Sequence, residues 1–279
     1  MLCLSWSPIT ITKVLSFCFV HYVHSVKLPV LKNMSELTSF QWGIMALAAI
    51  IIGLSKSGIP GMGILAVPMV AAVIPAKIST GFILPMLIAG DIIGVIYYHR
   101  HAEWSRLFRL FPWTILGIFA GWLSMGRLSD AQIRPLIGGI VLVMLALNLW
   151  RKRFSGPESR MPHHLGVAII IGLLAGFTTM MANAAGPIMV IYLLAMRLPP
   201  TAFIGTTAWY FLLVNTFKVP FSAQLGLITI PSLTFNAILF PFIALGAWAG
   251  IRFARHIPRK IFERLVQIFA ALGAIKLFF

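Results

Sequence analysis

Long stretches without a charged side chain recur along this chain and limit what it can fold into. Residues 165–196, 198–217 and 219–251 each lack Asp, Glu, Lys, Arg and His, and a helix of about 20 such residues crosses the roughly 30 Å hydrocarbon core of a bilayer. Of the 279 residues, 59% are hydrophobic and 10% are charged, whereas about a quarter are charged in soluble globular proteins. The sequence therefore predicts a polytopic integral membrane protein.

Positive charge is concentrated in the short connections between these stretches. Lys and Arg total 22 against 6 Asp and Glu, a formal net charge of +16, which in a soluble protein would indicate nucleic acid as the partner. Here Arg151–Arg153 and Arg252–Arg264 flank apolar runs, so the positive-inside rule places them on the cytoplasmic face. The positive charge therefore indicates mainly how the protein is oriented in a cell membrane, which we expect to be a bacterial inner membrane. A secondary interpretation of the same charge is an attraction for anions.

The cysteines and the amino-terminal segment stand apart from these apolar runs. Cys3 and Cys18 are the two cysteines of the sequence, so neither a disulfide framework nor a cysteine metal site is expected in the body of the protein. The histidines lack the spacing of a metal site, and we expect no metal and no cofactor. Residues 1–33 make a poor signal peptide. We expect them to be an amino-terminal extension, with the natural start at Met34.

An all-α helical bundle of about eight to ten membrane segments follows from the charges and the Gly and Pro breaks. The first two segments of each half are short or broken, which indicates discontinuous helices. The expected segments are residues 41–54, 60–76, 79–98, 108–126 and 133–150 in the first half, and 165–182, 186–197, 201–218, 231–251 and 262–278 in the second.

An internal repeat relates the two halves, 34–154 and 155–279. Residues 112–121 and 241–250 are identical at five of ten positions at an offset of 129 (241 less 112). Upstream, Thr80 pairs with Thr206 and Gly63 with Gly186 in the same order, at shorter offsets. With five spans per half, corresponding loops lie on opposite faces of the membrane, which predicts inverted repeats; four spans per half would place the Arg252 cluster outside.

A Gly-broken helix in each half is the feature with most functional content. Residues 58–63 hold three glycines and a proline and cannot form a regular helix, and 183–187 hold the second break. Broken backbone at membrane depth is tolerated where it lines a cavity, and helix amides there attract anions. Close packing of small residues is the alternative, which we favour for Gly117 and Gly246. The expected substrate-binding residues are Lys56, Ser57, Gly58, Gly61, Gly63, Thr80, Thr179, Asn183, Gly186 and Thr206.

Placing an ionisable residue inside a membrane segment costs free energy, so each such residue is treated as a candidate functional residue. Lys56 is expected either to oppose an anionic substrate or to reach out of a helix end as a surface anchor. Asp91 is a candidate coupling residue that carries a proton, with a structural ion pair as the alternative. Lys218 is interpreted as an anchor near the outer surface. The hydroxyls of Thr80 and Thr206 can bind a substrate or cap a helix.

The broken stretches resemble a known family. The run Gly-Leu-Ser-Lys-Ser-Gly-Ile-Pro-Gly-Met-Gly-Ile-Leu-Ala-Val-Pro at 53–68, with Asn-Ala-Ala-Gly-Pro at 183–187 and Phe-Lys-Val-Pro at 217–220, resembles the sulfite exporter TauE/SafE family, as a divergent branch. The likeness covers about 42–279. It implies a transporter that exports or exchanges small sulfur-containing or carboxylate anions, such as sulfite or organosulfonates, driven by protons or the membrane potential.

These observations together favour a secondary transporter of small anions over other functions. A channel-like or cation-handling membrane protein is the alternative within transport, because helix breaks also expose carbonyls that bind cations. A non-transporting membrane scaffold is a further alternative. No catalytic constellation and no ATP-binding motif is visible in the sequence, so an enzyme is not expected. The expected partners are the lipid bilayer, a small anion and coupling protons.

Overall fold

A computed structural model describes residues 37–57, 62–98, 102–154, 165–196, 198, 200–253 and 259–279 of the chain. The described parts are helices joined by short connections, and Thr38–Phe279 forms one compact unit. The proposed extension 1–33 lies outside the described residues. The first half comprises α2 (Ser39–Ser57), the 3₁₀ helix η2 (Met62–Leu65), α3 (Ala66–Ala71), α4 (Ala76–Tyr98), α5 (Trp104–Arg127) and α6 (Asp130–Phe154).

The second half repeats this order of elements. It comprises α7 (Leu165–Ala182), α8 (Gly186–Ala195), α9 (Pro200–Gln224), α10 (Ile230–Phe253) and α11 (Arg259–Lys276). Each of the ten segments expected from the sequence corresponds to a helix, with η2 and α3 together forming the second. Stretches of α2, α4, α5, α6 and α10 are long and apolar enough to cross a membrane. The prediction of an all-α, multi-pass membrane bundle is confirmed.

Two helix pairs hold the halves together by close backbone contact. A Cβ added to Gly53 of α2 would collide with the Ile243 carbonyl oxygen of α10, and one added to Gly246 would collide with that of Ile50. The pair α5 and α7 repeats this arrangement, because a Cβ on Gly117 would meet the backbone of α7. The interpretation of Gly117 and Gly246 as packing residues is confirmed. Small residues let membrane helices approach closely where hydrophobic driving force is absent.

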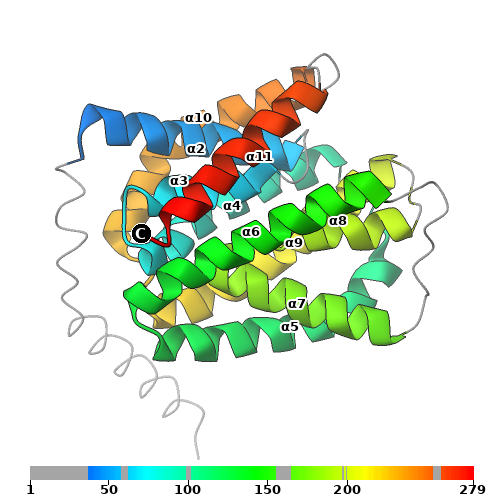
Figure 1. Ribbon diagram of the computed structural model, residues 1–279. Coiled ribbons are helices and arrows are strands. Elements are labelled where there is room, and N and C mark those ends of the chain that lie inside the picture. The colour runs from blue at the N-terminus through cyan, green and yellow to red at the C-terminus, as the bar shows by residue number, and fades with distance from the viewer. Residues whose placement is uncertain are drawn as a thin grey trace, which may run out of the picture. The chain divides into compact units, whose positions relative to one another are not determined.

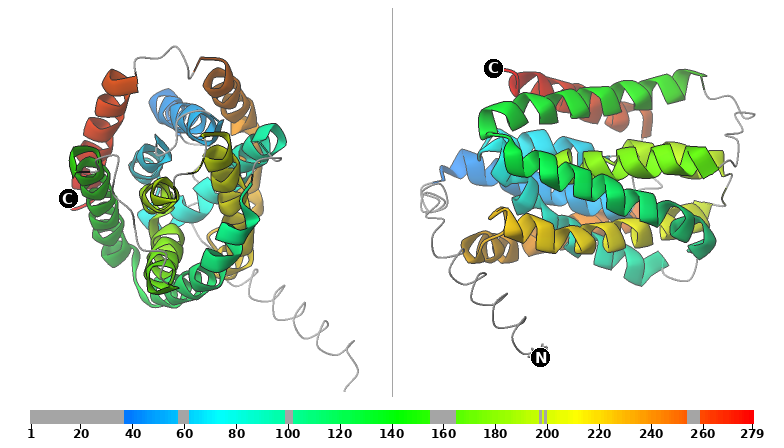
Figure 2. Two further views of the ribbon diagram at one scale, coloured as in Figure 1. Left: turned by 90° about the vertical axis from the view of Figure 1, so that its right-hand side faces the viewer. Right: turned by 90° about the horizontal axis from the view of Figure 1, so that it is seen from below.

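The halves are inverted with respect to each other. The first helix of one half packs on the fourth helix of the other, α2 on α10 and α7 on α5, and the third helices, α4 and α9, pack on each other. In Figure 1 the first helices, α2 and α7, run in opposite directions, and so do the last helices, α6 and α11. Helices α6 and α11 lie side by side on the outside of the bundle (Figure 2).

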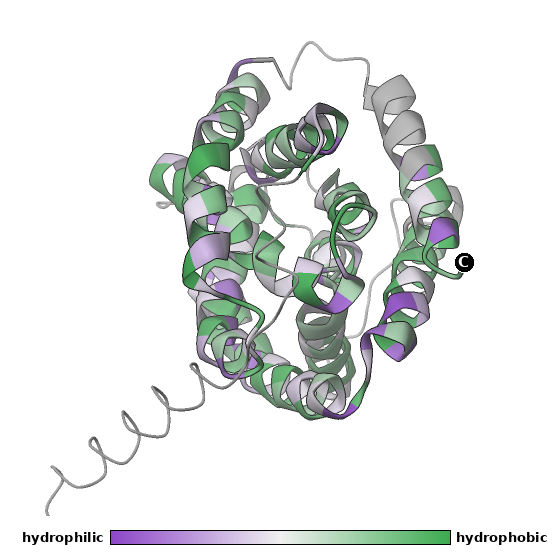
Figure 3. Cartoon of the chain, turned by 90° about the vertical axis from the view of Figure 1, so that its left-hand side faces the viewer, coloured by the Kyte–Doolittle hydropathy of each residue, from purple (hydrophilic) through white to green (hydrophobic). Residues whose placement is uncertain are grey.

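Helix α4 is the most deeply buried of the five helices that are long and apolar enough to cross a membrane. Of its membrane-crossing stretch, 72% is buried within the protein, against 33% for that of α10. Large apolar side chains such as Phe240 and Leu116 are exposed on the outer helices, and hydrophobic residues run through every helix coloured in Figure 3. α9 continues past Pro220 to Gln224, beyond the expected end at 218, since membrane helices tolerate internal proline.

Candidate functional site

The break between α7 and α8 is built around Asn183. Its φ is 50°, in the left-handed region that Asn adopts more readily than most residues. The Asn183 amide donates to the Thr179 carbonyl at 3.0 Å, and the Ala184 amide donates to the Thr178 carbonyl at 3.4 Å, which satisfies carbonyls at the end of α7. α8 then begins at Gly186. The chain therefore turns at Asn183 without leaving the protein interior.

The first-half break is bridged by a side chain. The Gly63 amide at the second residue of η2 donates to Ser55 Oγ of α2 at 2.9 Å. Ser55 therefore satisfies a backbone donor that the break would leave without a partner. The predicted site residues Gly58 and Gly61 lie between α2 and η2, outside the described residues.

A cavity of about 60 Å³ lies where the two breaks approach each other. It is about four times the roughly 15 Å³ that one water molecule needs, so it can hold a small ion with water. Its polar lining comes from both halves of the chain, and an apolar wall completes it. The polar side chains are Ser55, Lys56, Asp91, Thr179, Asn183, Thr207 and Asn215, and the apolar ones include Ile64, Leu87, Val190, Ile204 and Phe211.

Lys56 and Asp91 form a buried ion pair on this cavity. Lys56 Nζ lies 2.8 Å from Asp91 Oδ1, the Lys56 side chain is 12% exposed, and Asp91 is fully buried. The Lys56 ammonium also lies 4.2 Å from the centre of the Phe211 ring, a distance at which the ring face attracts a cation. A lysine reaching out to the membrane surface would show none of these contacts. The anchor interpretation of Lys56 is therefore wrong.

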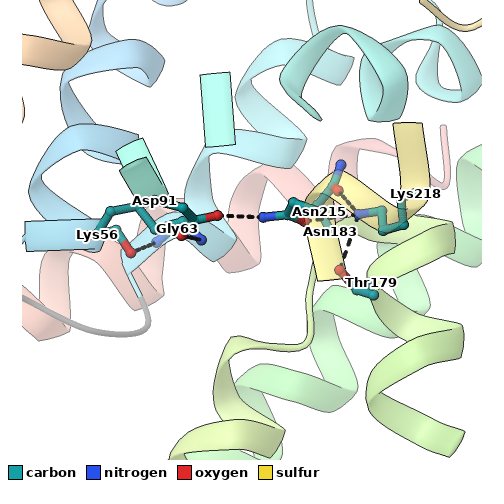
Figure 4. A network of polar contacts seen from close by, with 8 residues as sticks. Lys56, Gly63, Asp91, Thr179, Asn183, Asn215 and Lys218 are labelled. Atoms are coloured by element: carbon teal, nitrogen blue, oxygen red, sulfur yellow. Dashed lines mark hydrogen bonds and ion pairs between the residues drawn. The ribbon is translucent and has the colours of Figure 1, made fainter. Parts of the chain in front are cut away.

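Asn215 connects this ion pair to a second lysine (Figure 4). Its amide nitrogen donates to Asp91 Oδ2 at 2.7 Å, and its amide oxygen accepts from Lys218 Nζ at 3.4 Å. Asn215 can reach Lys218 because these two residues lie three positions apart on one face of α9. Asn215 is 1% exposed. A continuous polar chain therefore runs from α2 through α4 to α9.

Lys218 lies in the interior of the bundle and not at its surface. The side chain is 1% exposed, and its Nζ donates to Asn183 Oδ1 at 2.6 Å and to Thr179 Oγ1 at 3.2 Å. The interpretation of Lys218 as an anchor near the outer surface is wrong. Hydropathy alone misplaced it, because a lysine close to the end of an apolar run is usually a surface residue.

The structure brings together six of the predicted site residues around the cavity. Lys56, Gly63, Asp91, Thr179, Asn183 and Gly186 line it. Ser57, Thr80 and Thr206 are not among its lining residues.

The hydroxyls of these three residues serve helix contacts. Ser57 Oγ lies 2.9 Å from the carbonyls of Gly53 and Ala247, and Thr80 Oγ1 donates to the Lys77 carbonyl at 2.8 Å. Thr206 Oγ1 accepts from the Glu103 amide at 2.9 Å, just before α5 begins. This bond joins α9 to the residue before α5, and Thr206, the seventh residue of α9, does not cap its own helix. The Thr80 carbonyl, not its hydroxyl, reaches the site, because it accepts from Asn183 Nδ2 at 2.9 Å.

Asn215 and Phe211 line the cavity but were not predicted as site residues from the sequence. Asn215 precedes Lys218 by three residues, and this spacing of an amide and a lysine inside an apolar run was the available signal. Phe211 carried no signal, since one aromatic residue in a membrane helix is more often packing than site.

The two halves contribute different chemistry at equivalent positions. Thr179 stands 123 residues after Lys56 (179 less 56), the offset that also separates Gly63 from Gly186. On the first half the lysine lies on the first helix and pairs with a carboxylate of α4. On the second half a threonine occupies that position and accepts from a lysine of α9. The scaffold is repeated, but the site that it encloses is asymmetric.

Many membrane transporters are built from two inverted halves with a broken helix in each and a binding site between the breaks, and this chain has that architecture. The model of the sulfite exporter TauE/SafE family matches residues 45–277, and the chain belongs to this family. It is a multi-pass membrane transporter, as the resemblance of its broken stretches predicted. No curated protein and no solved structure gives a significant match.

Proposed function

We propose that this protein is a secondary transporter that exports small sulfur-containing anions, such as sulfite and organosulfonates, across the cell membrane. The family's description names sulfite, and the charge of the cavity supports an anionic substrate. Related carboxylates share the same charge and hydrogen-bonding chemistry. In this proposal the membrane potential or a proton gradient supplies the energy.

The observation that carries this proposal is the balance of charge around the cavity. Two lysines, Lys56 and Lys218, and one carboxylate, Asp91, belong to one connected network. A buried charge without a counter-charge is strongly unfavourable. An anion in the cavity supplies that counter-charge and accepts hydrogen bonds from Lys56, which is one of the residues that line the cavity.

The two helix breaks lie on either side of such an anion, and each belongs to a different half of the protein. Lys56 ends α2 next to the first break, whereas Asn183 forms the second break and is bound by Lys218 of α9. Rocking of one half against the other would change access to the cavity while the anion stays between the breaks. Asp91 is the proposed coupling residue, because its carboxylate already occupies one donor of Lys56 and protonation would release that donor.

The experiment that tests this proposal is anion flux in proteoliposomes. The purified full chain is reconstituted, and uptake of radiolabelled sulfite is followed with and without an imposed pH gradient and membrane potential. Unlabelled organosulfonates, carboxylates and chloride are added as competitors. We expect sulfite uptake above that of protein-free vesicles, with competition by organosulfonates. Cation flux without anion flux would instead support the cation-handling alternative. If neither ion crossed the membrane, the non-transporting scaffold would be the remaining alternative.

A further inference from the structure

The contacts of Lys218 define a positive charge that no carboxylate neutralises directly. Three oxygens surround its Nζ, those of Asn183, Thr179 and Asn215, at 2.6, 3.2 and 3.4 Å. An ammonium group has three N–H donors, so its hydrogen-bonding capacity is filled by neutral acceptors. Among the residues that the structure describes, no carboxylate forms an ion pair with it. Lys218 therefore contributes charge to the site but no free donor.

Lys56 has the complementary role. Its Nζ forms an ion pair with Asp91 Oδ1, its ammonium lies against the Phe211 ring, and the residue lines the cavity. Within the described part of the chain, Asp91 is the one side chain whose oxygen lies within ion-pair distance of Lys56 Nζ, so donors of Lys56 are available to a ligand in this proposal. Asp91 cancels one of the two positive charges. Two ammonium groups and one carboxylate leave a single positive charge around the cavity.

We infer that the transport site carries a net charge of +1 while Asp91 is ionised and therefore selects monovalent over divalent anions, with Asp91 as the residue that sets this charge. This inference rests on the proposed function and narrows its substrates to hydrogensulfite and monovalent organosulfonates. A monovalent anion brings the buried site to neutrality. A divalent anion of the same size leaves one negative charge in the membrane interior, beside the Asp91 carboxylate.

The test compares two tetrahedral anions of similar size, methanesulfonate with one charge and sulfate with two. Binding to the purified full chain in detergent is measured from the rise of its unfolding temperature with ligand concentration, at constant ionic strength. We expect methanesulfonate to bind the wild type about tenfold or more tightly than sulfate, since one unit of buried charge is worth at least that factor. Equal or tighter binding of sulfate overturns the inference.

Asp91→Asn raises the charge of the site by one while keeping its size and its hydrogen bond to Asn215. We expect this variant to shift the preference by about tenfold or more toward sulfate. Glu103→Gln is the matched control, because it removes one carboxylate from an exposed position before α5. The control should keep the wild-type preference. A folded Asp91→Asn protein with an unchanged preference contradicts the proposed role of Asp91.

The double variant Asp91→Asn/Lys218→Gln returns the site to a charge of +1. We expect it to recover the preference for methanesulfonate that Asp91→Asn loses, although its affinity is lower. Failure of a folded double variant to recover this preference overturns the charge rule. Should either variant fail to fold, the comparison of the two anions on the wild type still decides the charge of the site.

These readouts separate the inference from the proposed function. Binding of methanesulfonate without flux in proteoliposomes would overturn transport and leave the charge rule intact. Flux of sulfite without any preference between methanesulfonate and sulfate would overturn the charge rule and leave transport intact.

Discussion

The Lys218 ammonium donates a 2.6 Å hydrogen bond to the Asn183 side-chain oxygen, and this contact ties the long helix α9 to the break between α7 and α8. The side-chain nitrogen of Asn183, Nδ2, donates a second hydrogen bond to the Thr80 carbonyl of α4 at 2.9 Å. A single side chain therefore joins the break to both central helices. Any rocking of the halves that moves α8 against α4 or α9 must strain or break these bonds.

Asn183→Gly should preserve the turn and impair transport. Glycine adopts a φ of 50° without strain, but it loses the bonds to Lys218 and Thr80. A hydrogen bond to a charged group is worth about 1.5–3 kcal/mol, so we expect a stability loss of that order and a drop in sulfite flux. Asn183→Ala should be less stable than Asn183→Gly by about 1 kcal/mol, since its left-handed backbone is strained. Thermal unfolding and proteoliposome flux measure both effects.

The reverse order of stability would contradict this account of Asn183. A glycine variant with unchanged flux would show that the side-chain bonds of Asn183 are structural and do not take part in transport.

Lys56→Met should abolish most anion transport and destabilise the protein. The change removes the cavity-facing donor and leaves Asp91 buried without its partner, which costs about 3–5 kcal/mol. We expect flux to fall by about 10- to 100-fold from the lost donor alone. The measurement is sulfite uptake normalised to the amount of monodisperse protein.

The double variant Lys56→Met/Asp91→Asn separates these two effects. It removes both charges, so stability should return toward that of the wild type while flux stays low. Wild-type flux in the folded double variant would assign Lys56 a purely structural role.

The helices of this protein were predictable from its sequence because lipid imposes a simple rule on them. Every backbone group inside the membrane needs a partner, so each apolar run of sufficient length becomes a helix. Gly117 and Gly246 illustrate a further predictable contact, since small residues mark close packing. The broken stretches around Gly63 and Asn183 were also recognisable, because no regular helix accommodates their composition.

The charged network was only partly predictable, because it depends on which helix faces meet. Asp91 and Lys56 were suspected from their cost in an apolar run, but they lie on α4 and α2, and their pairing follows from tertiary packing. Lys218 was misplaced because its partners Thr179 and Asn183 lie on another part of the chain. Hydropathy measures the surroundings expected for a residue type and carries no information on such partners.

Glycines at the crossings of the halves should not tolerate alanine. Gly246→Ala places a methyl group against the Ile50 carbonyl of α2, and Gly176→Ala places one against the Thr114 carbonyl of α5. We expect each to destabilise the protein by about 1–3 kcal/mol, the usual cost of overpacking. Gly43→Ala and Gly139→Ala are matched controls, since an added Cβ meets nothing within 4 Å at either position.

The controls should be neutral or slightly stabilising, because alanine favours helix over glycine by up to about 1 kcal/mol. Thermal unfolding in detergent compares the four variants. Equal stability of the crossing and control variants would contradict the close approach of the helices.

The inverted arrangement predicts opposite accessibility for the connections after α4 and after α9. Glu103 and Gln224 are both exposed, and they lie near the carboxyl ends of α4 and α9, which run in opposite directions in Figure 1. In a background with Cys3 and Cys18 replaced by serine, we expect Gln224→Cys to react with a membrane-impermeant maleimide on intact cells. Glu103→Cys, next to the basic connection, should react after the cells are lysed. Labelling of both from outside would contradict inversion, whereas labelling of Glu103→Cys alone would keep inversion and reverse the orientation given by the positive-inside rule.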